Sequence, residues 1–258
     1  MFSQPLLFSF IVLTAKHIYT SYINEKLLDR TAYKKYNIYD NEYRASETRR
    51  SGRNNALSFI ETPGERNITI GNFDGVHIGH RRLIALLGDD ARRTVFTFTH
   101  HTREGTPGFA RLYPPEINDM ILRSPAVGAE EIIRADFTSL CAMEPEAFVN
   151  EVLFPLSLRS VVCGNDFRFG KGAVGDTKLL GALLGARGVR LVTVGCVSLG
   201  CEPVSTTAIK KELSLGNPAN AAKMLGCCYF IHSKVNAGNR LGRRLNAATV
   251  NQSLYSGC

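Results

Sequence analysis

The sequence NITIGNFDGVHIGH, residues 67–80, decides the fold, because a short β-branched run leads through a glycine-rich turn into a helical pattern. The run NITI is typical of a buried strand, and the glycines allow a close approach of the backbone to a ligand. A helix that begins after such a turn presents unpaired N–H groups and a partial positive charge, which favour an anion. His77 and His80 flank this helix start, and each can donate a hydrogen bond to phosphate oxygen. A histidine pair alone is more often structural, but this context favours an anion site.

The alternation of strand and helix patterns continues along the chain. Short apolar runs predict further strands at residues 94–98, 131–133, 160–163 and 189–194. Helical patterns lie between them, at residues 80–87, 116–123, 145–154 and 176–187. Such alternation indicates an α/β fold with a parallel sheet flanked by helices, in which ligands bind beyond the carboxyl ends of the strands.

Composition limits the class of protein. Of the 258 residues, 44% are hydrophobic and 21% are charged, which favours a packed core over global disorder. No apolar run reaches the roughly 18 residues of a membrane span, although Pro5–Ala15 faintly resembles the apolar part of a signal peptide. The 7 cysteines form no cluster with metal-ligand spacing, and their odd number indicates a reducing compartment, the cytoplasm.

The net charge of +8 is concentrated at the two ends of the chain. Residues 67–226 carry 17 basic against 16 acidic side chains, whereas residues 1–66 carry 10 against 7 and residues 227–258 carry 4 against none. We therefore expect no nucleic-acid partner, because such binding needs a basic face on the folded part. We expect residues 1–66 to be an extension or linker and residues 67–226 to be the main domain. The sequence does not indicate an oligomeric state.

A second motif, VSTTAIKK, occupies residues 204–211. Three hydroxyl side chains ahead of a helical run predict an N-cap. Lys210 and Lys211 then lie near the start of a helix, where cations oppose the helix dipole. A bound anion would turn this cost into an attraction, so we favour phosphate recognition here.

A third motif, GNDFRFGKG, occupies residues 164–172, directly after a predicted strand. Its glycines, its acidic residue and the aromatic pair Phe167 and Phe169 fit a loop that grips a flat or phosphorylated ligand. A glycine turn whose two phenylalanines fill the core explains the same pattern equally well.

Together these motifs resemble the bacterial FAD synthetase family, a branch of the HxGH nucleotidyltransferases. GNFDGVHIGH is similar to its first signature, GNDFRFG to its GxDFRFG loop, and VSTTAIK to its ISSTxIR motif, in the same order. The resemblance spans about residues 67–226 and implies a Rossmann-like nucleotidyltransferase fold. Residues 227–258 resemble the truncated start of the riboflavin kinase domain that part of the family carries.

The resemblance implies transfer of AMP from ATP to FMN, with release of pyrophosphate, and no riboflavin kinase activity. His77, His80 and Lys210 would carry the catalysis. The nucleotide would be bound by Gly71, Asn72, Phe73, Asp74, Gly75, Gly79, Ser205, Thr206 and Thr207. The loop near the flavin and the nucleotide would be Gly164, Asn165, Asp166, Phe167, Arg168 and Phe169. Mg²⁺ is expected to bridge the phosphates, with ligands that the sequence does not identify.

The chain also departs from the family pattern. Lys210 replaces an arginine, Asn118 stands where a lysine is usual, and His100-His101-Thr102 replaces Pro-His-Pro, which leaves His101 as a possible site residue. In the kinase-like segment, residues 246–251 (NAATVN) replace GFPTAN, so Thr249 and Asn251 match while the glycine and proline are lost.

These departures leave two alternatives open. In the first, the chain is a diverged protein that binds a nucleotide or a flavin without turnover. In the second, it is an HxGH nucleotidyltransferase that uses a different phosphorylated acceptor.

Overall fold

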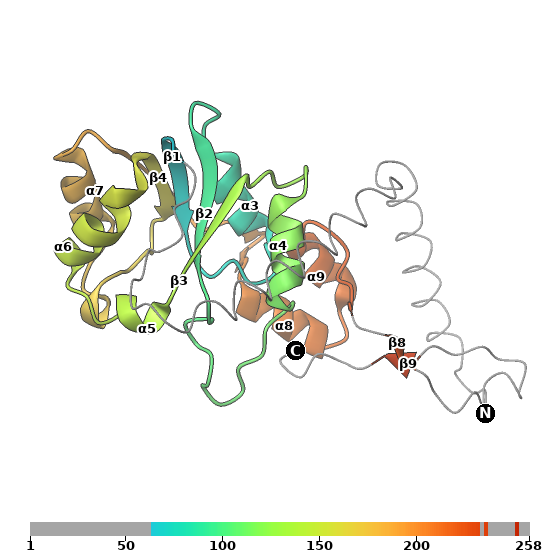
Figure 1. Cartoon of the computed structure of the whole chain (residues 1–258). Helices are drawn as coiled ribbons and strands as arrows, with labels where there is room; N and C mark the ends of the chain where they lie inside the picture. The colour runs from blue at the N-terminus through green and yellow to red at the C-terminus, as the bar shows by residue number, and fades with distance from the viewer. Residues whose placement is uncertain (1–62, 233–234, 237–250, 253–258) are drawn as a thin grey trace, which may run out of the picture. The chain divides into compact units, whose positions relative to one another are not determined.

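The computed structural model describes residues 63–232 and two short strands at 235–236 and 251–252. A five-stranded parallel sheet of order β3-β2-β1-β4-β5 forms its centre (Figure 1). Its strands are β1 (Arg66–Ile70), β2 (Arg92–Phe98), β3 (Glu131–Ala135), β4 (Leu158–Gly164) and β5 (Arg190–Val194). Thr69 of β1 lies opposite Val95 of β2 on one side and Val162 of β4 on the other. The predicted α/β fold, the parallel sheet and all five predicted strands are confirmed.

Helices connect the strands. They are α3 (Ile78–Ala85), α4 (Pro115–Arg123), α5 (Phe137–Leu140), α6 (Pro145–Ala147), α7 (Thr177–Gly185), α8 (Thr206–Ser214) and α9 (Pro218–Leu225). Helix α3 begins two residues before its predicted start, because the side chain of His77 caps it. The stretch 145–154 is helical as predicted, but it changes type: α6 passes into a π-helical segment, η1 (Phe148–Leu153), and then into a 3₁₀ turn, η2 (Phe154–Leu156), which holds Pro155.

The remaining elements are short. They are the 3₁₀ turn η3 (Lys171–Ala173) and two antiparallel pairs, β6 (Ser198–Leu199) with β7 (Glu202–Pro203) and β8 (Val235–Asn236) with β9 (Asn251–Gln252). No helix in the described part of the chain is long and apolar enough to span a bilayer.

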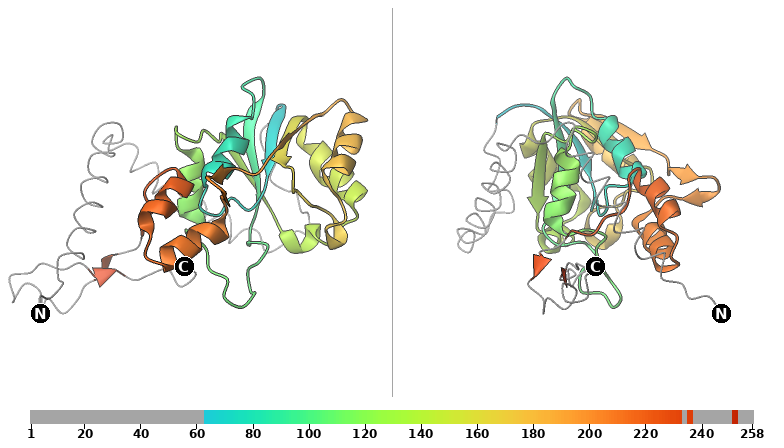
Figure 2. Two further views of the ribbon diagram at one scale, coloured as in Figure 1. Left: turned by 180° about the vertical axis from the view of Figure 1, so that it is seen from behind. Right: turned by 90° about the vertical axis from the view of Figure 1, so that its right-hand side faces the viewer.

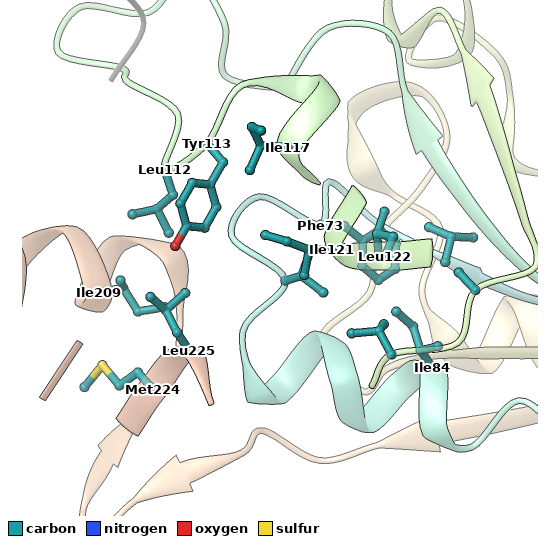
Figure 3. Packing of buried hydrophobic residues seen from close by; sticks show 14 of the residues in the cluster. Phe73, Ile84, Leu112, Tyr113, Ile117, Ile121, Leu122, Ile209, Met224 and Leu225 are labelled. Carbon is teal, nitrogen blue, oxygen red and sulfur yellow. The ribbon is translucent and has the colours of Figure 1, made fainter. Parts of the chain in front are cut away.

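Each face of the sheet has its own hydrophobic cluster. The first joins Val95 and Val162 of the sheet to residues of α3, α4, α8 and α9. Figure 2 shows these helices from two further sides, and Figure 3 shows the packing of cluster residues such as Ile84, Ile121 and Leu225. The second joins Ile68 and Phe96 to residues of α7 and η1 on the other face. Burial on both faces explains why the central strands are nearly continuous runs of apolar residues.

The segment after α9 packs on the first cluster. The ring of Tyr113 is stacked against Tyr229 and Phe230, with centroids 5.5 and 4.9 Å apart. Ile231, by contrast, is 58% exposed. Residues 227–230 therefore pack with the main domain, beyond its predicted end at 226. The predicted linker, the signal-like run and most of the kinase-like segment lie outside the described residues, as do residues 1–62.

The topology places the first and third sequence motifs at the carboxyl end of the sheet. The chain leaves β1 toward β2 and β3 and then returns to β4 on the opposite side of β1. Between β1 and β4 the direction of winding therefore reverses, and ligands bind α/β sheets at the carboxyl ends of such strands. The loops that follow β1 and β4 are the first and third motifs of the sequence.

An ion pair at the opposite edge stabilises the sheet. Arg66, which is 1% exposed, donates two hydrogen bonds to Glu131, with Nε 2.6 Å from Oε2 and Nη2 3.2 Å from Oε1. We expect Glu131→Gln to lower the free energy of unfolding by about 1–3 kcal/mol, because it replaces a charged acceptor of the buried guanidinium with a neutral one. Urea denaturation measures this loss. The exposed neighbour Glu130 provides the control, and an equal loss in Glu130→Gln would contradict the interpretation.

Candidate active site

Two histidine rings lie together at the start of α3. The rings of His77 and His80 are stacked, with centroids 3.7 Å apart and planes inclined by 16°. The backbone N–H of His80 donates to Nδ1 of His77 at 3.4 Å, which makes His77 the N-cap of the helix. Gly79 permits this arrangement, since a Cβ there would lie 3.1 Å from the His77 ring. Both imidazole rings therefore lie at the N-terminal end of α3.

The turn before the helix is strained. Phe73 and Val76 adopt positive φ angles of 50° and 44°, which cost roughly 1–3 kcal/mol each for side chains of this kind. Both side chains are fully buried, and the ring of Phe73 lies 4.9 Å from that of His80. Gly75 has φ 81°, and its N–H donates to Oδ1 of Asn118 at 3.0 Å. Packing and this hydrogen bond therefore hold the turn in a costly conformation beside the histidines.

Asp74 connects the first motif to the second. Its carboxylate is 1% exposed, accepts the N–H of Leu112 at 2.9 Å and lies 3.3 Å from Nζ of Lys210. The hydroxyl of Thr206 donates to the carbonyl of Asp74 at 3.0 Å. Lys210 also donates to the carbonyl of Ala110. Three chain segments thus meet at one buried carboxylate.

The hydroxyl residues of the second motif differ in position. The side chain of Ser205 accepts the N–H of Ala208 at 3.1 Å and caps α8, as the pattern predicts. The hydroxyl of Thr206 is hydrogen-bonded to the backbone carbonyl of Asp74, whereas Thr207 is exposed.

The loop between β2 and α4 brings His101 to the same place. Asn72 binds Thr102 twice, through its amide nitrogen at 2.9 Å and its amide oxygen at 3.1 Å. The ring of His101 lies 4.5 Å from that of Phe109, and Nζ of Lys210 lies 5.1 Å from the Phe109 ring. The N–H of Gly71 donates to the backbone carbonyl of Phe96 in β2 at 3.1 Å, which holds the first motif on the sheet.

Burial keeps these histidines neutral. It lowers the pKa of His77 to about 4, and it lowers the pKa of His80 well below its usual value, with His77 and His101 acting in the same direction. Burial also lowers the pKa of His101 to about 4, while Asp74 acts against this shift. Because Nδ1 of His77 accepts a hydrogen bond, its proton lies on Nε2. Nδ1 of His80 has no hydrogen-bond partner among the described residues.

These shifts predict an acid-sensitive fold. In the folded state the pKa of His77 lies near 4, below the ordinary value of 6.5, so the unfolded chain binds more protons between these pH values. From this group alone we expect the free energy of unfolding to fall by about 2 kcal/mol between pH 7.5 and pH 5. His77→Asn keeps an acceptor that can cap the helix, and its free energy of unfolding should fall by about 2 kcal/mol less than that of wild type between pH 7.5 and pH 5. Urea denaturation at both pH values measures this, and an unchanged pH dependence in the variant would contradict it.

The loop after β4 divides into buried and exposed residues. Phe167 and Phe169 stack on each other; Phe169 is buried in the second hydrophobic cluster, whereas Phe167 is only partly buried against it. Asn165, Asp166 and Arg168 are exposed. A Cβ at Gly164 would lie 2.5 Å from Oδ1 of Asp166, an exposed side chain that can turn away, so the close contact alone does not demand glycine there. The polar side chains of this loop and the exposed part of Phe167 are accessible to a ligand.

Some residues at this edge were not selected from the sequence. Asn118, noted only as a departure, supports the first motif through Gly75. Arg111 binds Glu104 at 2.6 Å and lines a pocket with Arg134 and Asp119. No motif marks these residues, because they come from the β2–α4 loop, from α4 and from β3 and are brought together only by the fold.

The described residues offer no protein cage for a metal ion. No three His, Cys, Asp or Glu side chains gather in a suitable group among them. Mg²⁺ commonly binds with few protein ligands and with substrate phosphates and water, so any such ion would enter with the nucleotide.

Comparisons with known proteins agree with the motifs. A family described as FAD synthetase matches residues 60–208. The bifunctional riboflavin kinase/FMN adenylyltransferase of Escherichia coli (strain K12) is 28% identical over 205 residues, which cover 72% of this chain and 62% of the relative. The FAD synthetase of Listeria monocytogenes is 28% identical over 183 residues, covering 68% and 74%. The chain thus spans less than two thirds of the Escherichia coli relative.

A solved structure shares the fold. It is described as the crystal structure of a macrolide-efflux protein from Streptococcus pneumoniae, and it superimposes with a TM-score of 0.67 at 23% identity. The alignment covers 76% of this chain and 66% of the other. At this identity the likeness supports the Rossmann-like α/β architecture alone.

Proposed function

Since the chain belongs to the FAD synthetase family, we propose that it transfers AMP from ATP to FMN and releases pyrophosphate. The observation that carries this proposal is the stacked pair of His77 and His80 at the start of α3, with Lys210 joined to the same motif through Asp74. Negative charge accumulates on the phosphoryl group in the transition state, and fixed donors aimed at it lower the barrier.

The two histidines act as neutral donors in this proposal. The tautomer of His77 leaves its Nε2–H free to donate to an oxygen of the α-phosphate. His80 lies against it in the same stack and presents a second imidazole to the triphosphate. The arriving negative charge raises both pKa values, so the rings can take up positive character as charge develops.

Lys210 supplies a permanent positive charge. An oxygen of the FMN phosphate attacks the α-phosphorus, and the bond from that phosphorus to the bridging oxygen breaks. The electron pair leaves with pyrophosphate, and Lys210 neutralises it. The FMN phosphate is already ionised at neutral pH, so no side chain needs to remove a proton. We assign no covalent enzyme intermediate and no step to Mg²⁺, which supplies charge neutralisation on the phosphates when it is bound with ATP.

A pyrophosphate-release screen tests the proposal. Purified chain with ATP and Mg²⁺ is offered FMN, pantetheine phosphate, nicotinamide mononucleotide or glycerol phosphate. Of the four acceptors, we expect only FMN to cause release of pyrophosphate. We also expect no phosphorylation of riboflavin, because residues 246–251 lack the glycine and proline of the kinase motif. Release with another acceptor would identify a different nucleotidyltransferase, and binding of ATP or FMN without release would identify a binding protein.

A further inference from the structure

The segment that follows α9 contacts the helix that carries the two histidines. Gly226 ends α9 with φ 74°, and a Cβ there would lie 2.9 Å from Cγ2 of Ile78 and 3.7 Å from Cδ of Arg81. Nη2 of Arg81 also donates to Sγ of Cys227 at 3.6 Å. Because Ile78 is the first residue of α3, the brace, as we call residues 226–230, begins against the first turn of that helix.

Arg81 connects the brace to the strained turn. Its Nε–H donates to the backbone carbonyl of Val76 at 3.0 Å. Val76 has a φ of 44°, and its carbonyl belongs to the peptide group that leads into His77. Strain of this kind persists only where the surrounding structure holds it, so we expect the turn to relax when this charged donor is removed. The hydrogen bond from Arg81 therefore helps to fix the direction in which the ring of His77 points.

The far end of the brace reaches the same turn by a second route. Tyr229 and Phe230 stack on the ring of Tyr113, which is buried. The preceding residue, Leu112, donates its N–H to the buried carboxylate of Asp74 inside the turn. The brace thus supports the first motif from both of its ends.

We propose that Arg81 is a positioning residue for the histidine pair and that the brace keeps it in place, so that AMP transfer depends on the seating of residues 226–230. This inference rests on the proposed function, because it names the residues that hold the imidazoles in line with the α-phosphate. Arg81 acts through the carbonyl of Val76 and not on the substrate.

Steady-state kinetics with ATP and FMN test the role of Arg81. Arg81→Met keeps the length of the side chain and removes its donors, and we expect kcat to fall by about 10- to 100-fold, the range for a hydrogen bond from a charged group. KM for ATP and for FMN should stay within about threefold of wild type, because misplaced rings affect the transition state most. Arg81→Gln should recover most of kcat, since its amide nitrogen takes the place of Nε and can donate to Val76. Arg82 is exposed, so Arg82→Met is the matched control and should turn over as wild type does.

A pair of glycine variants tests the brace. In Gly226→Ala the new methyl group collides with Ile78, which pushes the brace away from α3. Gly216, after α8, has φ 75°, and a Cβ there has nothing within 4 Å. Both substitutions therefore introduce the same backbone strain, but only Gly226→Ala disturbs the contact with α3. We expect Gly226→Ala to lower kcat by about tenfold, as a small displacement of reacting groups does, and Gly216→Ala to leave kcat unchanged.

The arrangement of the rings can also be measured without substrate. In chain labelled at histidine, the nuclear Overhauser effect between the ring protons of His77 and His80 reports their stack, because the centroids lie 3.7 Å apart. We expect this effect to weaken in Arg81→Met and in Gly226→Ala, and to persist in the conservative variant and in both controls. Each measurement is made below the thermal midpoint of the variant, so that the folded chain is observed.

Three results would contradict the inference or its basis. If Arg81→Met retains its kcat or its ring-to-ring effect, or if Arg82→Met loses as much, Arg81 does not position the histidines. If Gly226→Ala and Gly216→Ala lose kcat equally, the brace does not hold Arg81. If the wild-type chain forms no FAD, the proposed function fails, whereas the ring-to-ring effect still decides whether Arg81 and the brace hold the histidine pair.

Discussion

Replacement of His80 by alanine is expected to lower kcat for AMP transfer by about 10²- to 10³-fold, the usual loss when one fixed donor to a developing charge is removed. His80 lies in the stack with His77 at the first turn of α3, and its ring lies 4.9 Å from that of Phe73 in the strained turn. KM for ATP should change less than kcat, because the charge that His80 meets is largest in the transition state.

Two controls accompany this variant. His232 is exposed and lies outside the site, so His232→Ala should turn over as wild type does. His80→Gln keeps a hydrogen-bond donor in a side chain of similar reach and should lose less activity than His80→Ala, provided both variants melt near the wild-type temperature. Unchanged turnover in His80→Ala would remove the proposed role of this histidine.

Replacement of Lys210 by methionine is expected to lower kcat/KM by about 10²-fold, which corresponds to about 2.7 kcal/mol of transition-state stabilisation. The loss has two sources. The charge that neutralises the departing pyrophosphate disappears, and the buried carboxylate of Asp74 loses its cation. Lys210→Arg should retain most activity, because the arginine restores both the charge and the partner of Asp74.

The neighbouring lysine offers a close control. Lys211 follows Lys210 directly in α8 but is exposed, so Lys211→Met should leave kcat/KM nearly unchanged. If Lys210→Met and Lys211→Met lose activity equally, the effect belongs to the general charge of α8 and not to the contact with Asp74. Asp74→Asn tests that contact from the other side, since an amide still accepts the N–H of Leu112 but cannot pair with Lys210.

Local pattern was sufficient to predict the frame of the site. The run from Asn67 to His80 specified a strand, a turn and a helix, and the structure has all three with both imidazoles on the helix end. The five strands followed from apolar runs, because a parallel sheet buries both faces of each strand. What the pattern misjudged was detail at ends, such as the start of α3, where a histidine side chain serves as the cap.

The polar group beside the histidine pair could not be predicted in this way. Arg111, Asp119 and Arg134 come from a loop, a helix and a strand, and only the folded sheet brings them to one pocket. The aromatic pair of the third motif had two equally good explanations, and burial in the second cluster favours the structural one for Phe169, while Phe167 is only partly buried. Long-range partners of this kind leave no periodic signal along the chain.

The most direct test of the central claim follows the α-phosphate itself. The purified chain is incubated with ATP labelled at the α-phosphorus, Mg²⁺ and FMN, and the products are separated by chromatography. We predict label in FAD, one pyrophosphate for each FAD and no label on the protein, with all of this strongly reduced in His80→Ala. Consumption of ATP without labelled FAD, or label retained on the protein as an intermediate, would contradict direct AMP transfer at the histidine pair.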